Sequence, residues 1–394
     1  MFVKNILDAP FWDRGFRPFF LLGAAYAVFM IVAWVGVFGG FFRIPVAWND
    51  PTMWHAHEMI LGFTLVIIAG FLLTAVSNWT GGAPTRRGYL MLLCSVWLAG
   101  RMSFWWAYAP QPVLSFIDLS FIPLLGICLA IPLIRAKNHH NLSFIGILTL
   151  LFLCDLHMHL IALGIVKGDP RITAYTAVLV VMMVVSIVSS RIIPSFTVAG
   201  LRQRGLKPFQ TDQMKTDITA LLLLFALGLS VFFTGLRSMP TALCALAAGL
   251  IHLWRMRHWH SLKTGEEPML WILHAGHFWL VAGLLTLGLH ALGLVMFASL
   301  AMHMLTVGCI GSLTLGMMAR VSLGHTGRLI KANSAMVLAF LMMQWATIVR
   351  CLAIIVGSNR YLSWIMVTGI FWVAAYSLYL VVYTPILLGP RADR

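Results

Sequence analysis

Twelve apolar runs of about 17–25 residues follow one another along the chain, each long enough to cross the hydrocarbon core of a bilayer. They lie near residues 18–38, 54–76, 88–108, 113–134, 143–165, 172–192, 216–235, 239–256, 269–290, 294–318, 333–356 and 362–387. Only 10% of the 394 residues are charged, against about 25% in a soluble protein. The sequence therefore predicts an all-α, polytopic membrane helical bundle of about twelve transmembrane helices, forming a single integral membrane domain over residues 1–394. We expect the run at 18–38 to be the first span rather than a cleavable signal peptide.

The basic residues are distributed unevenly between alternate loops. Of the 27 Lys and Arg residues, twenty lie in the even-numbered loops and the two termini, and two fall inside spans. The odd-numbered loops carry only Arg43, Lys167, Arg171, Arg237 and Arg360. The positive-inside rule then predicts that both termini are cytoplasmic. The formal net charge of +15 therefore comes from basic residues that flank the spans. We expect these residues to contact the lipid bilayer, and no nucleic-acid partner is needed to explain the charge.

The cysteines give no support to a disulfide framework or a thiolate metal site. All six lie inside apolar runs, and none belongs to a Cys-x-x-Cys motif. Ligands for a metal would therefore have to come from other side chains.

Histidines and carboxylates inside the spans are the strongest functional signal, because ionisable groups at that depth are costly and seldom incidental. The predicted orientation places one group in the outer part of the membrane: His55, His57 and Glu58 in the second span, Asp155, His157 and His159 in the fifth, and His303 in the tenth. It places a second group near the cytoplasmic face, with His274 and His277 in the ninth span and His252 and His325 as possible partners. A single membrane histidine is often a hydrogen-bonded packing residue. Nine histidines within or at the ends of spans exceed what packing requires, so we expect at least two to bind haem or a metal.

Helix geometry limits which of these side chains act together. Residues i and i+2 point about 200° apart, so His55 and His57 are not expected to bind one metal, and neither are His157 and His159. We expect one member of each pair to face the site. The pairs that share a helix face are His55 with Glu58, Asp155 with His159, and His274 with His277.

Arg101 in the third span and Asp118 in the fourth lie towards the outer ends of neighbouring antiparallel helices. One interpretation is a buried structural ion pair. The other is that Arg101 binds haem propionates, since a guanidinium matches carboxylates bidentately. The sequence slightly favours the structural pair.

Several motifs resemble those of the NnrS family of bacterial inner-membrane proteins. They are GFRPFF (15–20), WHAHEM and the following GF (54–63), AGFLLTAVSNWTG (69–81), AGR ending at residue 101, LHMHL (156–160), RIIPSFT (191–197), LWILHAGHFWL (270–280) and HMLTVGCIGSLTLGMMARVSLGHTGR (303–328). These motifs extend through nearly the whole chain.

The resemblance implies a haem- and copper-containing protein of the bacterial cytoplasmic membrane that acts in nitric-oxide metabolism, denitrification or resistance to nitrosative stress. It does not assign individual histidines. Under this reading, b-type haem and copper would use His55, His57, His157, His159, His303, His274 and His277, with His57, His159, His303, His274 and His277 as metal ligands. Glu58 and Asp155 would handle protons and Arg101 would assist catalysis. Nitric oxide or a related small molecule and an electron donor would be the partners.

Two other classes remain open, and so does the question of whether the protein is an enzyme. Twelve spans suit a transporter for metal or haem, although the sequence shows no convincing internal repeat. The chain is also compatible with a non-catalytic membrane subunit that scaffolds a reductase.

Overall fold

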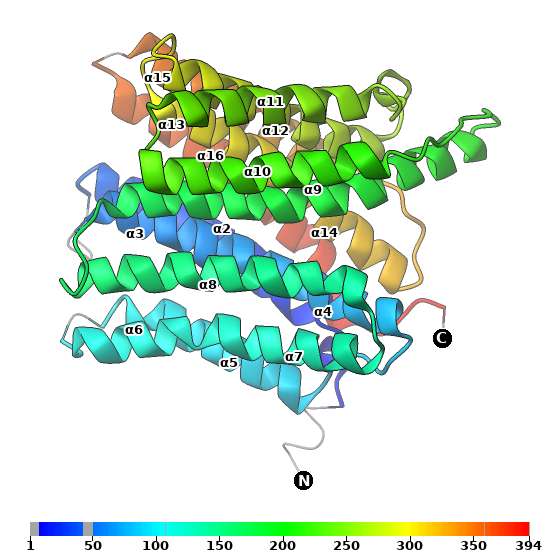
Figure 1. Cartoon of the computed structure of the whole chain (residues 1–394). Coiled ribbons are helices and arrows are strands. Elements are labelled where there is room, and N and C mark those ends of the chain that lie inside the picture. The colour runs from blue at the N-terminus through cyan, green and yellow to red at the C-terminus, as the bar shows by residue number, and fades with distance from the viewer. Residues whose placement is uncertain (1–7, 42–49, 107, 358, 394) are drawn as a thin grey trace. The chain divides into compact units, whose positions relative to one another are not determined.

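The computed structural model describes residues 8–41, 50–106, 108–357 and 359–393, so Arg43 of the charge analysis lies outside the described residues. Every regular element among the described residues is a helix (Figure 1). The first half contains α2 (Phe16–Phe38), α3 (Pro51–His57), the π-helix η2 (Glu58–Thr64), α4 (Leu65–Thr80), α5 (Gly88–Ser103), α6 (Gln111–Leu119), α7 (Phe121–Arg135) and α8 (Ser143–Ala162). The second half contains α9 (Pro170–Gln203), α10 (Met214–Thr234), α11 (Met239–Met256), α12 (Pro268–Ala291), α13 (Ala298–His303), the π-helix η5 (Met304–Gly311), α14 (Ser312–His325), α15 (Ser334–Val356) and α16 (Tyr361–Leu388). Short 3₁₀ turns occur at Pro10–Trp12, His139–Leu142 and Ser261–Lys263.

The predicted helical membrane bundle is confirmed. Within the described part of the chain, eleven helical segments are long and apolar enough to cross a membrane. The predicted span at 88–108 corresponds to α5, which ends at Ser103 and has only 16 residues. The predicted span at 113–134 is divided at Ser120, because Pro123 lacks the N–H that would bond back to residue 119.

The described residues form two compact units. Three of the four boundaries between the units fall within α9, α14 and α16, and the fourth lies in the segment between α14 and α15. Unit 1 comprises residues 1–174, 318–330 and 376–394, and unit 2 comprises residues 175–317 and 331–375. The expectation of a single domain stays a prediction.

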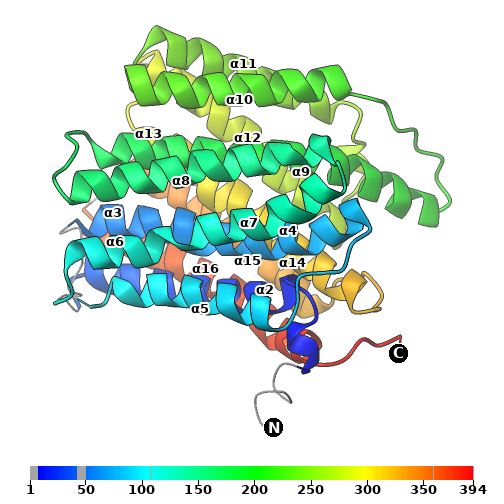
Figure 2. The same cartoon turned by 60° about the horizontal axis from the view of Figure 1, so that its bottom comes forward.

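Unit 1 is built around α4, which packs against α2 and α7, while α7 also contacts α5 and α8 (Figure 2). The start of α2 is fixed to the end of α16 by Arg17, whose Nη1 donates to the carbonyls of Leu387 at 2.8 Å and Gly389 at 2.6 Å. Because Arg17 is buried, these bonds satisfy carbonyls that the helix end would otherwise leave unpaired.

Unit 2 is centred on α12, which packs against α11, α13 and η5. Close approach between helices depends on small residues. A methyl group added at Gly308 of η5 would lie 2.6 Å from the Trp279 ring of α12, so only glycine fits there.

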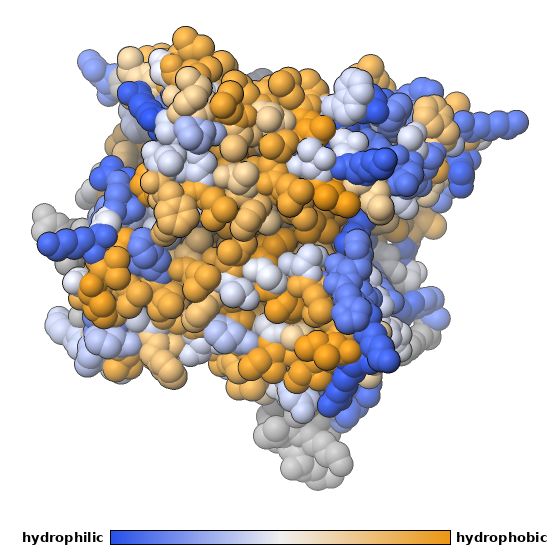
Figure 3. All heavy atoms as spheres, viewed as in Figure 1, coloured by the Kyte–Doolittle hydropathy of each residue, from blue (hydrophilic) through white to orange (hydrophobic). Residues whose placement is uncertain are grey.

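Over the face shown in Figure 3, hydrophobic residues cover the middle of the helices and hydrophilic residues lie at their ends, as expected for helices that span a bilayer.

Candidate metal centre

The second span begins with a capped α-helix and then changes its geometry. The Asp50 carboxylate caps α3 by accepting a hydrogen bond from the Thr52 backbone N–H at 2.8 Å. The α-helix ends at His57, and the π-helix η2 begins at Glu58. The change from α to π therefore occurs between the two polar residues on which the site depends.

Side chains satisfy the altered backbone of η2. The Thr64 hydroxyl donates to the carbonyl of Met59 at 2.7 Å, and the Trp97 indole N–H donates to the carbonyl of Gly62 at 3.1 Å. Short π-helices frequently occur at functional sites, where they reorient side chains. Here the π-helix directs Glu58 and Gly62 towards α5.

Four side chains from three helical segments bring their ligand atoms together in unit 1. We call them the four-residue cluster: His57, Asp118, Asp155 and His159. The Nε2 atom of His57 lies 3.1 Å from Oδ2 of Asp118 and 3.0 Å from Oδ1 of Asp155. The Nε2 atom of His159 lies 3.0 and 3.5 Å from the same two oxygens. All four ligand atoms lie within 4.8 Å of one another, and none of the four residues is more than 3% exposed.

The hydrogen bonding of His57 fixes which nitrogen faces the cluster. Its Nδ1 lies 2.8 Å from Oε1 of Glu58, and an ionised carboxylate only accepts hydrogen bonds. Beside an ionised Glu58, neutral His57 therefore carries its proton on Nδ1 and presents a lone pair at Nε2. That lone pair faces the lone pairs of Asp118 and Asp155, so a proton or a metal cation is required between them. A carboxylate bonded to the far nitrogen of a ligating histidine is the usual arrangement around protein-bound metals.

The charges around the cluster also indicate that a cation binds there. Arg101 contacts Glu58, with Nη1 2.8 Å from Oε1, and its Nη2 forms an ion pair with Asp118. Tyr26 donates its hydroxyl proton to Oε2 of Glu58. With neutral imidazoles, the three ionised carboxylates exceed the single guanidinium by two negative charges. A divalent cation would bring this buried set to neutrality.

The separations of the ligand atoms suit a small metal ion. Four N and O ligands placed about 2.0–2.2 Å from a tetrahedral metal lie roughly 3.3–3.6 Å from one another. The four distances of 3.0 to 3.5 Å between the histidine nitrogens and aspartate oxygens are close to these values. Imidazole and carboxylate ligands suit Cu²⁺, Zn²⁺ and Fe²⁺, whereas thiolate ligands favour Cu⁺.

The twin histidines of spans two and five face different surroundings, as the 200° argument predicts. His55 stacks on Trp34 with ring centroids 4.4 Å apart, while His57 points into the cluster. His157 lies 2.8 Å from the Thr173 hydroxyl, while His159 joins the cluster. Asp155 and His159 act together, as their four-residue spacing predicts.

One pairing inferred from helix geometry was wrong. Glu58 was expected to share a face with His55 alone, but its carboxylate bonds to His57. The backbone at Glu58 is still α-helical, with φ −66° and ψ −32° and its N–H bonded to the Trp54 carbonyl. The contact forms because the glutamate side chain is long enough to reach the ring of its sequence neighbour, which an argument from helix faces does not consider. The predicted structural pair between Arg101 and Asp118 is confirmed, and this pair also contacts the metal ligands.

The histidines expected near the cytoplasmic face have different environments. Both nitrogens of His274 have partners: Nε2 lies 2.9 Å from the Thr197 hydroxyl and Nδ1 lies 2.9 Å from that of Ser261. His277 is fully buried, and neither of its nitrogens has a hydrogen-bond partner among the described residues. Its ring centroid lies 5.3 Å from that of His252. The metal site expected here stays a prediction.

The tautomer of His252 limits that second site. Arg255 donates from Nη1 to Nδ1 of His252 at 3.1 Å, and a guanidinium cannot accept. Neutral His252 therefore carries its proton on Nε2, so that nitrogen is a donor and not a metal ligand in this arrangement.

His303 belongs to unit 2 and ends α13 immediately before the π-helix η5. Its Nδ1 lies 2.7 Å from the carbonyl of Ser299, which fixes the proton of the neutral ring on Nδ1. Its predicted role as a ligand stays a prediction. His57 stands in the same relation to η2, and a glycine follows each histidine after five residues, at Gly62 and Gly308. This local similarity was not predicted.

Sequence reasoning missed the full role of two residues. Asp118 was interpreted only as the partner of Arg101, and Tyr26 was not considered. A carboxylate within the apolar run at 113–134 was the available signal for Asp118. No sequence signal indicated the role of Tyr26, because a tyrosine within an apolar span is common.

Comparison with known proteins identifies the family. No curated protein matches the sequence. The family model described as NnrS protein matches residues 10–391, a range that includes all four residues of the cluster together with Tyr26, Glu58 and Arg101. Because this match extends over nearly the whole chain, the protein belongs to the NnrS family.

Proposed function

We propose that this protein is a metal-containing component of nitric-oxide metabolism in the bacterial cytoplasmic membrane, and that the four-residue cluster holds its metal ion. The observation that carries the proposal is the convergence of the His57 lone pair with two buried carboxylates. Membership of the NnrS family supports it. Nitric oxide is small and partitions into lipid, so an enclosed site within the membrane remains accessible to it.

Copper is the metal that the family resemblance implies, and the cluster fits it. Two imidazole nitrogens and two carboxylate oxygens provide four ligands suitable for Cu²⁺. The described cysteines are all free, and none belongs to the cluster. A bound copper ion would supply a coordination position for nitric oxide and a one-electron redox couple, for which an electron donor would be the partner.

The four-residue cluster does not fit haem. A porphyrin bound through His57 and His159 would lie between their Nε2 atoms, where Oδ2 of Asp118 lies 3.1 and 3.0 Å from the two nitrogens. The haem implied by the family therefore requires ligands elsewhere. Since Nδ1 of His303 is hydrogen-bonded to the Ser299 carbonyl, His303 has the tautomer that an axial ligand needs.

The surrounding residues then have distinct roles. Glu58 orients His57 and increases its basicity, because it accepts from Nδ1. Tyr26 donates a buried hydrogen bond to Glu58, so the two side chains provide a route for proton exchange next to the site. Arg101 offsets part of the negative charge through Glu58 and Asp118.

Metal content measured by elemental analysis of purified protein tests the proposal, because each of the two proposed histidine ligands has a second histidine on the same helix as its control. We expect about one copper per chain in wild type, and losses in His57→Gln and His159→Gln. His55→Gln and His157→Gln should retain the metal, since neither side chain reaches the cluster.

Equal metal content in all four variants would show that the cluster is not the metal site. Metal-free, colourless wild-type protein would instead favour the transporter or the scaffolding subunit. An electron paramagnetic resonance spectrum of the oxidised protein distinguishes Cu²⁺ with nitrogen and oxygen ligands from adventitious surface copper.

A further inference from the structure

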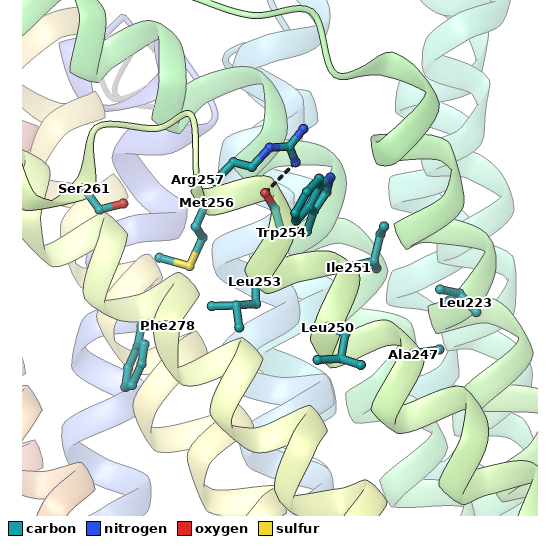
Figure 4. Close-up of a pocket in the computed structure, with 10 residues that line it drawn as sticks. All are labelled: Leu223, Ala247, Leu250, Ile251, Leu253, Trp254, Met256, Arg257, Ser261 and Phe278. Atoms are coloured by element: carbon teal, nitrogen blue, oxygen red, sulfur yellow. Dashed lines mark hydrogen bonds between the residues drawn. The ribbon is translucent and has the colours of Figure 1, made fainter.

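A large groove lies on the surface of unit 2 along α10, α11 and α12. Its volume is about 990 Å³, and aliphatic and aromatic side chains form most of its wall (Figure 4). Leu223, Ala247, Leu250, Leu253 and Phe278 lie along the groove. This volume is at the upper end of the range for small-molecule pockets, about 300–1,000 Å³.

The groove opens on a surface suited to contact with lipid. Leu250 is 58% exposed and Phe278 is 53% exposed, although both lie within helices long and apolar enough to span a membrane. In such helices, exposed apolar side chains face acyl chains rather than water. An occupant of the groove that enters from this side would therefore be at least partly hydrocarbon.

A cation lies at one end of the groove. Arg257 follows directly after the last residue of α11, with its guanidinium carbon 3.7 Å from the centre of the Trp254 ring. Its Nη1 donates to the Trp254 carbonyl at 2.9 Å, as Figure 4 shows. Arg257 is exposed and forms no ion pair with a carboxylate of the described residues, whereas Arg255 is buried and pairs with Asp217.

Trp254 and Arg257 lie at the end of α11, a helix long and apolar enough to span a membrane. Tryptophan and arginine at the end of a membrane-spanning helix are typical of the interface between hydrocarbon and water. The cation–π contact with the Trp254 ring holds the Arg257 guanidinium beside the groove and limits the directions in which its remaining N–H groups point. A planar guanidinium matches the oxygens of a phosphate bidentately.

We propose that this groove binds one anionic phospholipid, with acyl chains against Leu250 and Phe278 and the headgroup phosphate at Arg257. The unpaired positive charge favours an anionic lipid over a zwitterionic one. The proposal does not depend on the metal centre, which lies in unit 1.

Native mass spectrometry of the full chain tests the proposal. Delipidated protein would be titrated with phosphatidylglycerol and with phosphatidylcholine that have the same acyl chains. We expect wild type to prefer phosphatidylglycerol by about fivefold, the factor that corresponds to one basic residue at a membrane surface. Arg257→Gln should abolish this preference and Arg257→Lys should keep most of it.

Two further variants complete the test. Arg135→Gln removes an exposed arginine at the end of α7 in unit 1, and it should leave the preference unchanged. Ala247→Trp fills the groove and should weaken binding of both lipids.

Equal binding of the two lipids by wild type, or an undiminished preference in Arg257→Gln, would overturn the proposal. Displacement of the lipid by glycerol phosphate alone would also overturn it, because the groove would then contribute nothing and the site would recognise a free phosphate.

Discussion

His57 and Glu58 are adjacent in sequence, yet their side chains are hydrogen-bonded to each other, with Nδ1 of His57 2.8 Å from Oε1 of Glu58. The contact forms where the α-helix gives way to the π-helix η2. It places the His57 lone pair at Nε2, opposite Asp118 and Asp155, so one contact between sequence neighbours determines which nitrogen faces the site.

Replacing Glu58 with Gln should weaken metal binding without abolishing it. The amide cannot stabilise the Nδ1–H of His57 as a carboxylate does, and loss of such a partner typically lowers metal affinity by about 10- to 100-fold. Competition with a chelator of known affinity measures the change. An affinity equal to that of wild type would remove Glu58 from the metal centre.

Replacing Arg101 with Met should destabilise the protein. The change leaves Glu58 and Asp118 without their cationic partner, and breaking a buried ion pair in this way costs about 3–5 kcal/mol. Thermal unfolding in detergent checks this. Saturating Cu²⁺ or Zn²⁺ should restore part of the loss, because the metal neutralises the same carboxylates.

No recovery with either metal would contradict the charge balance proposed for the cluster. Arg350→Met serves as the control, because Arg350 donates to the Tyr361 hydroxyl in unit 2. Any decrease in the unfolding temperature of this variant should not be reversed by metal.

Acidification should release the metal. Both ligating imidazoles must be neutral to bind, so protons compete with the metal as the pH falls from about 8 to about 5. Metal occupancy at a series of pH values measures the effect, and His157→Gln should titrate as wild type does because His157 lies outside the cluster. Occupancy that is constant throughout this range would argue against histidine ligands.

His274 and His277, on one helix, should respond differently to replacement by Leu. His274→Leu removes partners of Thr197 and Ser261 and should lower stability by about 1 kcal/mol. His277→Leu replaces a buried ring without hydrogen-bond partners among the described residues, so its effect should be neutral or stabilising. Equal losses in the two variants would show that His277 has a ligand or partner of its own.

Much of the fold was predictable because the length and apolarity of a membrane-spanning helix are written directly in the sequence. The π-helices were not, since a shift from four- to five-residue hydrogen bonding leaves the hydropathy of the run unchanged. The break at Ser120 could have been found from Pro123.

The site was predictable only in part. Because residues i and i+2 of a helix point about 200° apart, the sequence correctly predicted that His55 and His57 have different surroundings. This prediction depends on one helix alone. The role of Asp118 was missed because it depends on tertiary packing, which brings α6 beside α8 and places Asp118 against His159, 41 residues later in the chain. The sequence of a single span does not indicate which other helix it will contact.

Gly62→Ala should damage the metal centre although glycine is not a ligand. A methyl group at Gly62 would lie 2.8 Å from Nη1 of Arg101 and 3.0 Å from the Tyr26 ring, so the guanidinium must move away from Glu58. Gly126→Ala is the matched control, because a methyl group there has no neighbour within 4 Å and the change should stabilise its helix by about 0.5–1 kcal/mol. We therefore expect Gly62→Ala to lower both metal affinity and the unfolding temperature, and Gly126→Ala to leave affinity unchanged. Unchanged affinity in Gly62→Ala would mean that the position of Arg101 does not matter to the metal.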